Sequence, residues 1–201
     1  MDIHPVTLTG RIIRLEPLSE LHSQELTVVG ANENIWRYML YGNIQTYEQM
    51  LSWVRDMLRF QSEGTDLPFA VIYSKSGRAI GATRYLNINS NHRHLEIGGT
   101  WYGEEYQGTG VNSEAKYLLL QHAFENLGCI RVQLKTDARN QRSQRAIERL
   151  GATREGILRH DMITPDGYLR DSVYYSILDG EWPEVKSRLE RRLEKYFLDT
   201  V

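Results

Sequence analysis

A short stretch with two glycines has the residue types of a phosphate-binding loop. It reads Gln107-Gly108-Thr109-Gly110-Val111-Asn112-Ser113 and lies between a predicted strand and a predicted amphipathic helix. Two glycines in four residues allow a tight turn and bring backbone N–H groups close to a ligand. The start of a helix adds free amide donors and the positive end of the helix dipole. The stretch therefore predicts an anion site that suits a pyrophosphate, although an ordinary strand-to-helix connection explains the same residues about equally well.

Two common phosphate-binding patterns do not fit this loop. A P-loop ends in Gly-Lys followed by Ser or Thr, and no such sequence is present here. A dinucleotide fingerprint needs a third glycine, but position 113 is Ser, and the loop follows several predicted antiparallel strands. Neither an NTPase nor a dinucleotide-binding protein is therefore favoured.

A second motif begins at Asn140, directly after another predicted strand. Asn140 is a good N-cap residue, and Ser143 follows three residues later on the same face of the predicted helix. The helix carries several arginines and ends at Leu150-Gly151-Ala152. By residue type alone, this pattern indicates a capping pair on a basic surface helix.

The two motifs together resemble those of the GNAT acetyltransferases. Gln107 to Asn112 is similar to the Q/R-x-x-G-x-G/A signature of that family, except that Asn112 stands where Gly or Ala is usual. Because Asn is a good N-cap, we expect a slightly altered helix start and a retained site. The pair Asn140 and Ser143, followed by Leu-Gly-Ala, resembles the branch of ribosomal-protein N-terminal acetyltransferases, and the resemblance extends over nearly the whole chain.

This resemblance implies acetyl-CoA as cofactor and assigns roles to residues of both motifs. Asn140 would orient the pantetheine arm, and Ser143 would donate a proton to the departing thiolate. Arg142 would lie near the cofactor phosphates, whereas a solvated helix face explains Arg145 and Arg149 at least as well. The implied cofactor-binding set is Gln107, Gly108, Thr109, Gly110, Val111, Asn112, Ser113, Asn140, Arg142 and Ser143, and no metal site is expected.

Acetyl transfer to an amine also needs a base and a stabilised oxyanion. An alkyl ammonium group with a pKa of about 10 is almost wholly protonated at neutral pH, whereas an N-terminal amine with a pKa of about 8 loses its proton more easily. Glu96 is the preferred base, since it precedes Gly98–Gly99, where we expect a strand bulge that presents N–H groups to the oxyanion. A salt bridge with Arg84 is an equal alternative for Glu96. His94 is a second candidate base, and Asp171 reads as a structural or substrate-gating carboxylate.

The elements that position these residues alternate between helix and strand. Periodicity predicts strands at 10–18, 67–74, 78–88, 94–102 and 130–137, and a long hairpin on either side of 165–167. It predicts helices at 46–62, from about 113, from about 140 and in the tail after Pro183. Together with the resemblance, this indicates a single α/β (α+β) GNAT domain over residues 1–201, with a mixed, mostly antiparallel sheet of about seven strands flanked by helices.

Composition limits the partners and the setting. The 201 residues carry 24 basic and 26 acidic side chains, a formal charge of −2, so bulk charge predicts no nucleic-acid or membrane partner. The single cysteine, Cys129, excludes an intramolecular disulfide and is expected to be a buried hydrophobe. No secretory signal is recognisable, and a cytoplasmic protein is expected. Analogy with the family admits a homodimer.

The acceptor amine is not specified by these motifs. The leading hypothesis is a protein N-terminal amine, as on a ribosomal protein, or a small primary amine. Amine-drug or polyamine detoxification is the alternative within the enzyme class, and a catalytically inactive CoA-binding regulatory module is the alternative outside it. We expect residues 31–63 and the last hairpin to form the acceptor pocket, where Trp36, Tyr38, Tyr41 and Trp53 would either line it or belong to the core.

Overall fold

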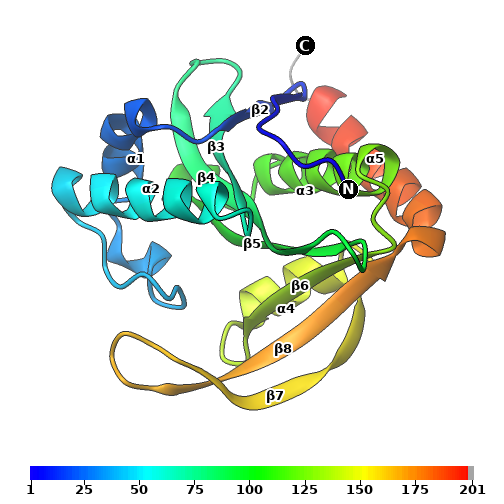
Figure 1. Ribbon diagram of the computed structural model, residues 1–201. Helices are drawn as coiled ribbons and strands as arrows, with labels where there is room; N and C mark the ends of the chain where they lie inside the picture. The colour runs from blue at the N-terminus through cyan, green and yellow to red at the C-terminus, as the bar shows by residue number, and fades with distance from the viewer. Residues whose placement is uncertain (199–201) are drawn as a thin grey trace.

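The computed structural model describes residues 1–198 as a central sheet with helices on both faces (Figure 1). The strands are β1 (Leu8–Thr9), β2 (Ile13–Pro17), β3 (Leu67–Tyr73), β4 (Ala79–Asn89), β5 (His94–Tyr102), β6 (Arg131–Asp137), β7 (Thr153–Ile163) and β8 (Leu169–Leu178). The helices are α1 (Ser23–Val29), α2 (Tyr47–Ser62), α3 (Val111–Gln121), α4 (Gln141–Glu148) and α5 (Trp182–Leu198). The expected fold class is confirmed, with one additional strand, because the two-residue β1 is too short to leave a periodic pattern.

Parallel pairing occurs at one place in the sheet, between β5 and β6. The strand order is β1-β2-β3-β4-β5-β6-β8-β7, and every other neighbouring pair is antiparallel. Pairing of β5 with β6 covers only His94–Glu96 against Arg131–Gln133, although both strands continue for several residues. The two strands therefore separate after Glu96, and an opening forms in the middle of the sheet.

The expected irregularity at Gly98–Gly99 is confirmed. The register between β4 and β5 shifts between Ala82 and Arg84, opposite this segment. Gly99 has a φ of +57°, and an added Cβ would lie 2.9 Å from the Tyr41 hydroxyl. A residue other than glycine would be strained there by both its backbone and its surroundings.

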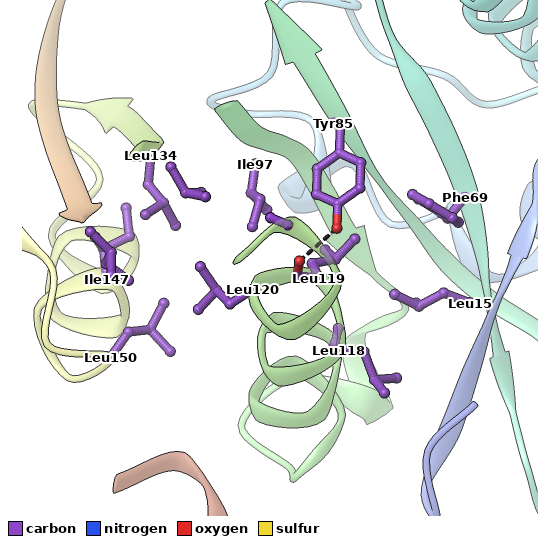
Figure 2. Close-up of a cluster of buried hydrophobic side chains, with 14 of the residues drawn as sticks. Leu15, Phe69, Tyr85, Ile97, Leu118, Leu119, Leu120, Leu134, Ile147 and Leu150 are labelled. Carbon is purple, nitrogen blue, oxygen red and sulfur yellow. Dashed lines mark hydrogen bonds between the residues drawn. The ribbon is translucent and has the colours of Figure 1, made fainter. Parts of the chain in front are cut away.

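Successive side chains of the strands enter two separate cores. In β3, Phe69 and Val71 belong to the core under α3 and α5, whereas Ala70 and Ile72 belong to the core under α1 and α2. This is the period of two expected for a strand covered on both faces. In the first core, the buried Tyr85 hydroxyl donates to the Leu119 carbonyl of α3 at 2.6 Å (Figure 2).

A buried carboxylate fixes α3 against the start of the sheet. Glu114 accepts backbone N–H groups from Arg11, Ile12 and Ile13 at 2.7–2.9 Å. Gly10 leaves the space for it, since a Cβ at Gly10 would overlap the carboxylate. This contact holds the first turn of α3, and so the glycine loop before it, in one place.

No helix within residues 1–198 combines the length and the apolar character needed to cross a membrane.

Candidate active site

A cavity of about 890 Å³ lies where β5 and β6 separate. It is lined by the glycine loop, the start of α3, the start of α4 and the segment after α1. The structure brings together most of the residues singled out by the sequence. The predicted residues that line the cavity are Glu96, Gln107, Gly108, Thr109, Asn112, Ser113, Asn140, Arg142 and Ser143.

Gly110 and Val111 are the members of the predicted cofactor-binding set that do not line the cavity. The two glycines of the loop serve different purposes. Gly108 has a φ of +80° with open space around it, so it provides the backbone conformation. Gly110 provides close packing, because a Cβ there would lie 2.6 Å from Ile12 and 2.9 Å from Tyr196. Val111 is buried in the core. Gly110 and Val111 therefore support the loop through close packing and not through contact with the cavity.

The start of α3 differs from the expectation at Asn112. The helix begins at Val111 with Gly110 as its N-cap, so the expected capping role of Asn112 is wrong. The Asn112 side-chain carbonyl instead accepts a hydrogen bond from the Tyr102 hydroxyl at 3.2 Å. The first intrahelical bond runs from the Glu114 N–H to the Gly110 carbonyl at 3.0 Å. The amides before Glu114 therefore lie ahead of the intrahelical ladder, as an anion-binding helix start requires.

The second motif forms the predicted cap. Asn140 is the N-cap of α4, and its side-chain oxygen accepts the Ser143 N–H at 3.0 Å. The cap uses the oxygen of the Asn140 amide, so its nitrogen can donate toward the cavity. Arg142 donates to Gln107 at 2.6 Å, and Gln107 in turn donates to the Tyr102 carbonyl at 3.0 Å. The two motifs, 35 residues apart, are thus in direct contact at the cavity.

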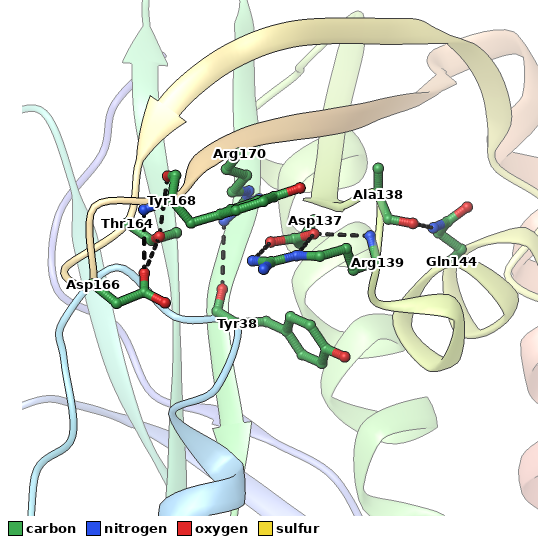
Figure 3. Close-up of polar contacts among 9 residues, drawn as sticks. All are labelled: Tyr38, Asp137, Ala138, Arg139, Gln144, Thr164, Asp166, Tyr168 and Arg170. Carbon is green, nitrogen blue, oxygen red and sulfur yellow. Dashed lines mark hydrogen bonds and ion pairs between the residues drawn. The ribbon is translucent and has the colours of Figure 1, made fainter.

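Arg139, just before α4, ties this motif to the last hairpin (Figure 3). It donates to the buried Asp137 carboxylate at 2.7 and 3.0 Å, and its guanidinium stacks 3.6 Å from the Tyr168 ring centre. Burial alone would raise the pKa of Asp137, but the hydrogen bonds from Arg139 lower it. Tyr38 lies beyond the same guanidinium, 5.8 Å away. Arg139 therefore connects α4, the hairpin and the segment after α1.

Glu96 lies where β5 and β6 separate, and only 2% of its surface is exposed. It accepts from Asn87 at 3.0 Å and from Gln133 at 2.9 Å, and Lys135 lies 3.6 Å away. The alternative of a salt bridge with Arg84 is wrong, because β5 is a central strand and Arg84 pairs with Asp66 at 2.9 Å. Glu96 is thus a fixed, buried carboxylate at the cavity.

The other two candidate acid-base residues lie outside the cavity lining. His94 stacks on His92 at the start of β5, with ring centres 6.3 Å apart. Asp171 accepts the backbone N–H of His160 at 2.8 Å, where His160 has a φ of +51°. The structural interpretation of Asp171 therefore holds, and its carboxylate fixes an irregularity of β7.

Lys116, on the second turn of α3, is not among the residues predicted from the sequence. Lys116 is 6% exposed, lines the cavity and donates to the Thr100 hydroxyl at 2.7 Å. Burial lowers the pKa of Lys116 to about 7. A signal was available, since a lysine three residues after Ser113 on an otherwise apolar helix face lies in line with the phosphate loop. Thr100 follows the bulge, so this amine lies between the loop and the bulged strand.

The aromatic residues before α2 divide between core and cavity. Trp36 and Trp53 are buried around Trp101, with ring centres 4.9 and 5.9 Å from it. Tyr38 and Tyr41 line the cavity, together with the hairpin residues Met162 and Arg170. Segments from both regions expected at the acceptor pocket therefore meet at one end of the cavity.

The donor set suits a nucleotide-linked thioester. Free amides at the start of α3, a glycine in the left-handed region and the basic side chains Arg142, Arg149 and Arg192 line one end of the cavity. A family model described as "Acetyltransferase (GNAT) domain" matches residues 13–153. The chain belongs to the GNAT acetyltransferase family. As a GNAT enzyme it is an N-acetyltransferase that uses acetyl-CoA as the acetyl donor.

Three relatives of this family illustrate the similarity. A crystal structure from T. thermophilus, assigned as an acetyltransferase, is 40% identical with a TM-score of 0.87, and the alignment covers 96% of this chain and all of the other. The ribosomal-protein-serine acetyltransferase of Escherichia coli K12 is 25% identical over 69% of this chain and 75% of its own length. The spermidine N(1)-acetyltransferase of the same strain is 22% identical over 85% and 88%.

Proposed function

We propose that this GNAT enzyme acetylates the α-amine of a protein N-terminus or of a small molecule. The observation that carries the proposal is Glu96, a buried carboxylate held by neighbouring side chains at the cavity where β5 and β6 separate. A carboxylate at the cavity can take the proton that an acceptor amine must lose. An α-amine with a pKa of about 8 loses that proton more easily than an alkyl amine with a pKa of about 10.

The two ends of the cavity have separate tasks in this proposal. The glycine loop and the first turn of α3 bind the pyrophosphate of acetyl-CoA, Asn140 orients its pantetheine arm, and Arg142 adds positive charge nearby. The acceptor enters on the side of Tyr38 and Tyr41. Acetyl-CoA supplies the activated acetyl group as a thioester.

Three groups of the chain then act on the reacting atoms. Glu96 takes a proton from the incoming amine, directly or through a water molecule. Backbone N–H groups of the Gly98–Gly99 bulge stabilise the negative charge that develops on the acetyl oxygen. Ser143 lines the cavity at the start of α4 and donates a proton to the departing thiolate.

A thiol-release assay over a panel of amines tests the proposal. Acetyl-CoA is expected to raise the thermal midpoint, and peptides with a free N-terminus are expected to release thiol faster than the same peptides with a blocked N-terminus. Faster release with spermidine than with any α-amine would instead favour polyamine acetylation, the activity named for one relative. A shift of the midpoint with no release from any amine would favour a regulatory module.

A further inference from the structure

A buried arginine at the acceptor end of the cavity has too few partners. Arg170 of β8 is 6% exposed and lines the cavity. Within residues 1–198, its side chain makes one hydrogen bond, from Nη1 to the Tyr38 carbonyl at a long 3.4 Å (Figure 3). Its Nε atom is fully buried and has no partner within the described residues. A guanidinium carries five N–H donors, so most of its hydrogen-bonding capacity is unused.

No carboxylate within residues 1–198 forms an ion pair with Arg170. Asp137, Asp161 and Glu96 are close enough to act on its charge, as is the Tyr174 ring. Each of these carboxylates is already engaged by another donor. Those donors are Arg139 for Asp137, the Tyr174 hydroxyl for Asp161, and Asn87, Gln133 and Lys135 for Glu96. Burial lowers the pKa of Arg170, although the three carboxylates act in the opposite direction.

A second arginine at this end of the cavity, Arg84, provides a contrast. Arg84 is also nearly buried and lines the same cavity, but it forms an ion pair with Asp66 at 2.9 Å. The chain thus supplies a dedicated carboxylate for Arg84 and none for Arg170 within the described residues. A buried cation that lacks a protein partner and faces a ligand cavity indicates a partner on the ligand.

We propose that the acceptor is an amine that also carries a carboxylate, and that Arg170 binds this carboxylate while Glu96 faces the amine. The inference rests on the proposed function, because it needs an amine acceptor at this end of the cavity. The carboxylate of the acceptor would face the positive charge of Arg170, and its amine would face the negative charge of Glu96. A polyamine carries no carboxylate and would leave Arg170 without a partner on the ligand.

The carboxylate has two sources with the same chemistry. It is either the terminal carboxylate of a free amino acid or dipeptide, or an acidic side chain near the N-terminus of a protein. Two matched pairs of acceptors separate them. The first pair is alanyl-alanine and its C-terminal amide, and the second is alanyl-aspartyl-alaninamide and alanyl-asparaginyl-alaninamide. Each pair differs in one negative charge and hardly in shape.

Assays of the wild-type protein alone test whether a carboxylate on the acceptor improves its acetylation. We expect kcat/KM for the acid to exceed that for the amide by about tenfold or more in one pair, because a charge-assisted contact with a buried guanidinium is lost in the amide. A ratio near one in both pairs overturns the inference. The pair that discriminates identifies the source of the carboxylate.

The variant Arg170→Gln tests whether Arg170 is the residue responsible. It should reduce the ratio between acid and amide to about one by raising KM for the acid, and leave KM for acetyl-CoA unchanged. Arg170→Lys should keep part of the preference, since it keeps the charge but not the planar donors. Arg159→Gln, an exposed arginine of the same hairpin outside the cavity lining, is the matched control. A preference that survives Arg170→Gln contradicts the assignment.

The same assay separates this inference from the proposed function. Release of thiol with all four peptides at equal rates would refute recognition of the carboxylate but not the α-amine acceptor. Release with spermidine but with none of the peptides would refute the α-amine acceptor as well. The acetyl-CoA-induced rise of the thermal midpoint shows that each variant is folded, so a loss of preference in a variant that retains this rise is assigned to acceptor binding.

Discussion

The two ends of the cavity are built in different ways. At the cofactor end, most of the groups come from two short, continuous stretches, Gln107–Ser113 and Asn140–Ser143, and many of them are backbone amides at helix starts. At the acceptor end, Arg84, Glu96, Lys135 and Arg170 come from four different strands and act through their side chains. In the proposed arrangement, a ligand common to the whole family contacts mainly local backbone groups, whereas the variable acceptor contacts side chains that only the folded sheet brings together.

The acceptor end gives the largest expected effect, through Glu96→Gln. Loss of the proposed base should lower kcat/KM by about 10²–10⁴-fold. KM for acetyl-CoA should stay within a small factor, because Glu96 lies away from both cofactor motifs. His94→Gln is the control, since His94 lies outside the cavity lining. If Glu96→Gln keeps its activity while His94→Gln loses it, the base has been misassigned.

Ser143→Ala tests whether the second motif contributes to chemistry as well as to cofactor binding. If the hydroxyl protonates the thiolate, kcat should fall by about 10²-fold, with little change in the dissociation constant of acetyl-CoA. Arg145→Ala, on the same helix but outside the cavity lining, should change neither quantity. An equal loss of turnover and affinity for Ser143→Ala would assign Ser143 to cofactor positioning. Both motifs at the cofactor end would then serve binding alone.

Lys116 is the exception to the comparison, because it is a buried charge on the cofactor side. Burial lowers its pKa to about 7, against an ordinary value of 10.5, so above pH 7 the unfolded chain binds one more proton than the folded chain. The free energy of unfolding should therefore rise with pH by up to about 1.4 kcal/mol per unit from this group alone. The penalty is fully present below pH 7 and is relieved as pH rises.

Urea unfolding of Lys116→Met and wild type between pH 7 and 8.5 measures this contribution. The difference between the two stability curves should change by about 2 kcal/mol over that range. Burial raises the pKa of Cys129 to about 11, but Cys129 is present in both proteins, so its contribution cancels in the difference between their curves. Lys75→Met, in an exposed turn, should stay parallel to wild type. Parallel curves for Lys116→Met would show that its amine keeps an ordinary pKa.

Gly108→Ala gives the smallest expected effect. Its φ of +80° costs a residue with a side chain about 1 kcal/mol, while the space around it is open. We expect acetyl-CoA affinity to fall by about fivefold, with kcat and acceptor preference unchanged. Gly156→Ala, where an added Cβ also meets nothing, controls for the loss of a glycine. A change in acceptor preference would show that the two ends of the cavity are coupled.

Residue types alone predict the glycine loop, the Asn140 cap, the bulge at Gly98–Gly99 and the order of nearly all elements. These features depend on backbone dihedral angles and on hydrogen bonds between residues a few positions apart, so residue types at short spacing are enough to specify them. The wrong prediction at Asn112 also concerns short-range hydrogen bonds, because it assigned the helix cap by residue type. Several residues near a helix start can cap it, and the contact with Tyr102 that fixes Asn112 comes from another element.

The partners of the buried charges follow only from the folded chain. By residue type, Glu96 could pair equally well with Arg84, and nothing in the sequence set apart Arg170. Their surroundings depend on where β5 and β6 separate and on which face of each strand meets the opening. That arrangement follows from strand register across the whole sheet, where a shift of one residue would turn each side chain to the opposite face. The acceptor end can therefore be described only from the folded structure, whereas the cofactor end can be predicted from sequence motifs.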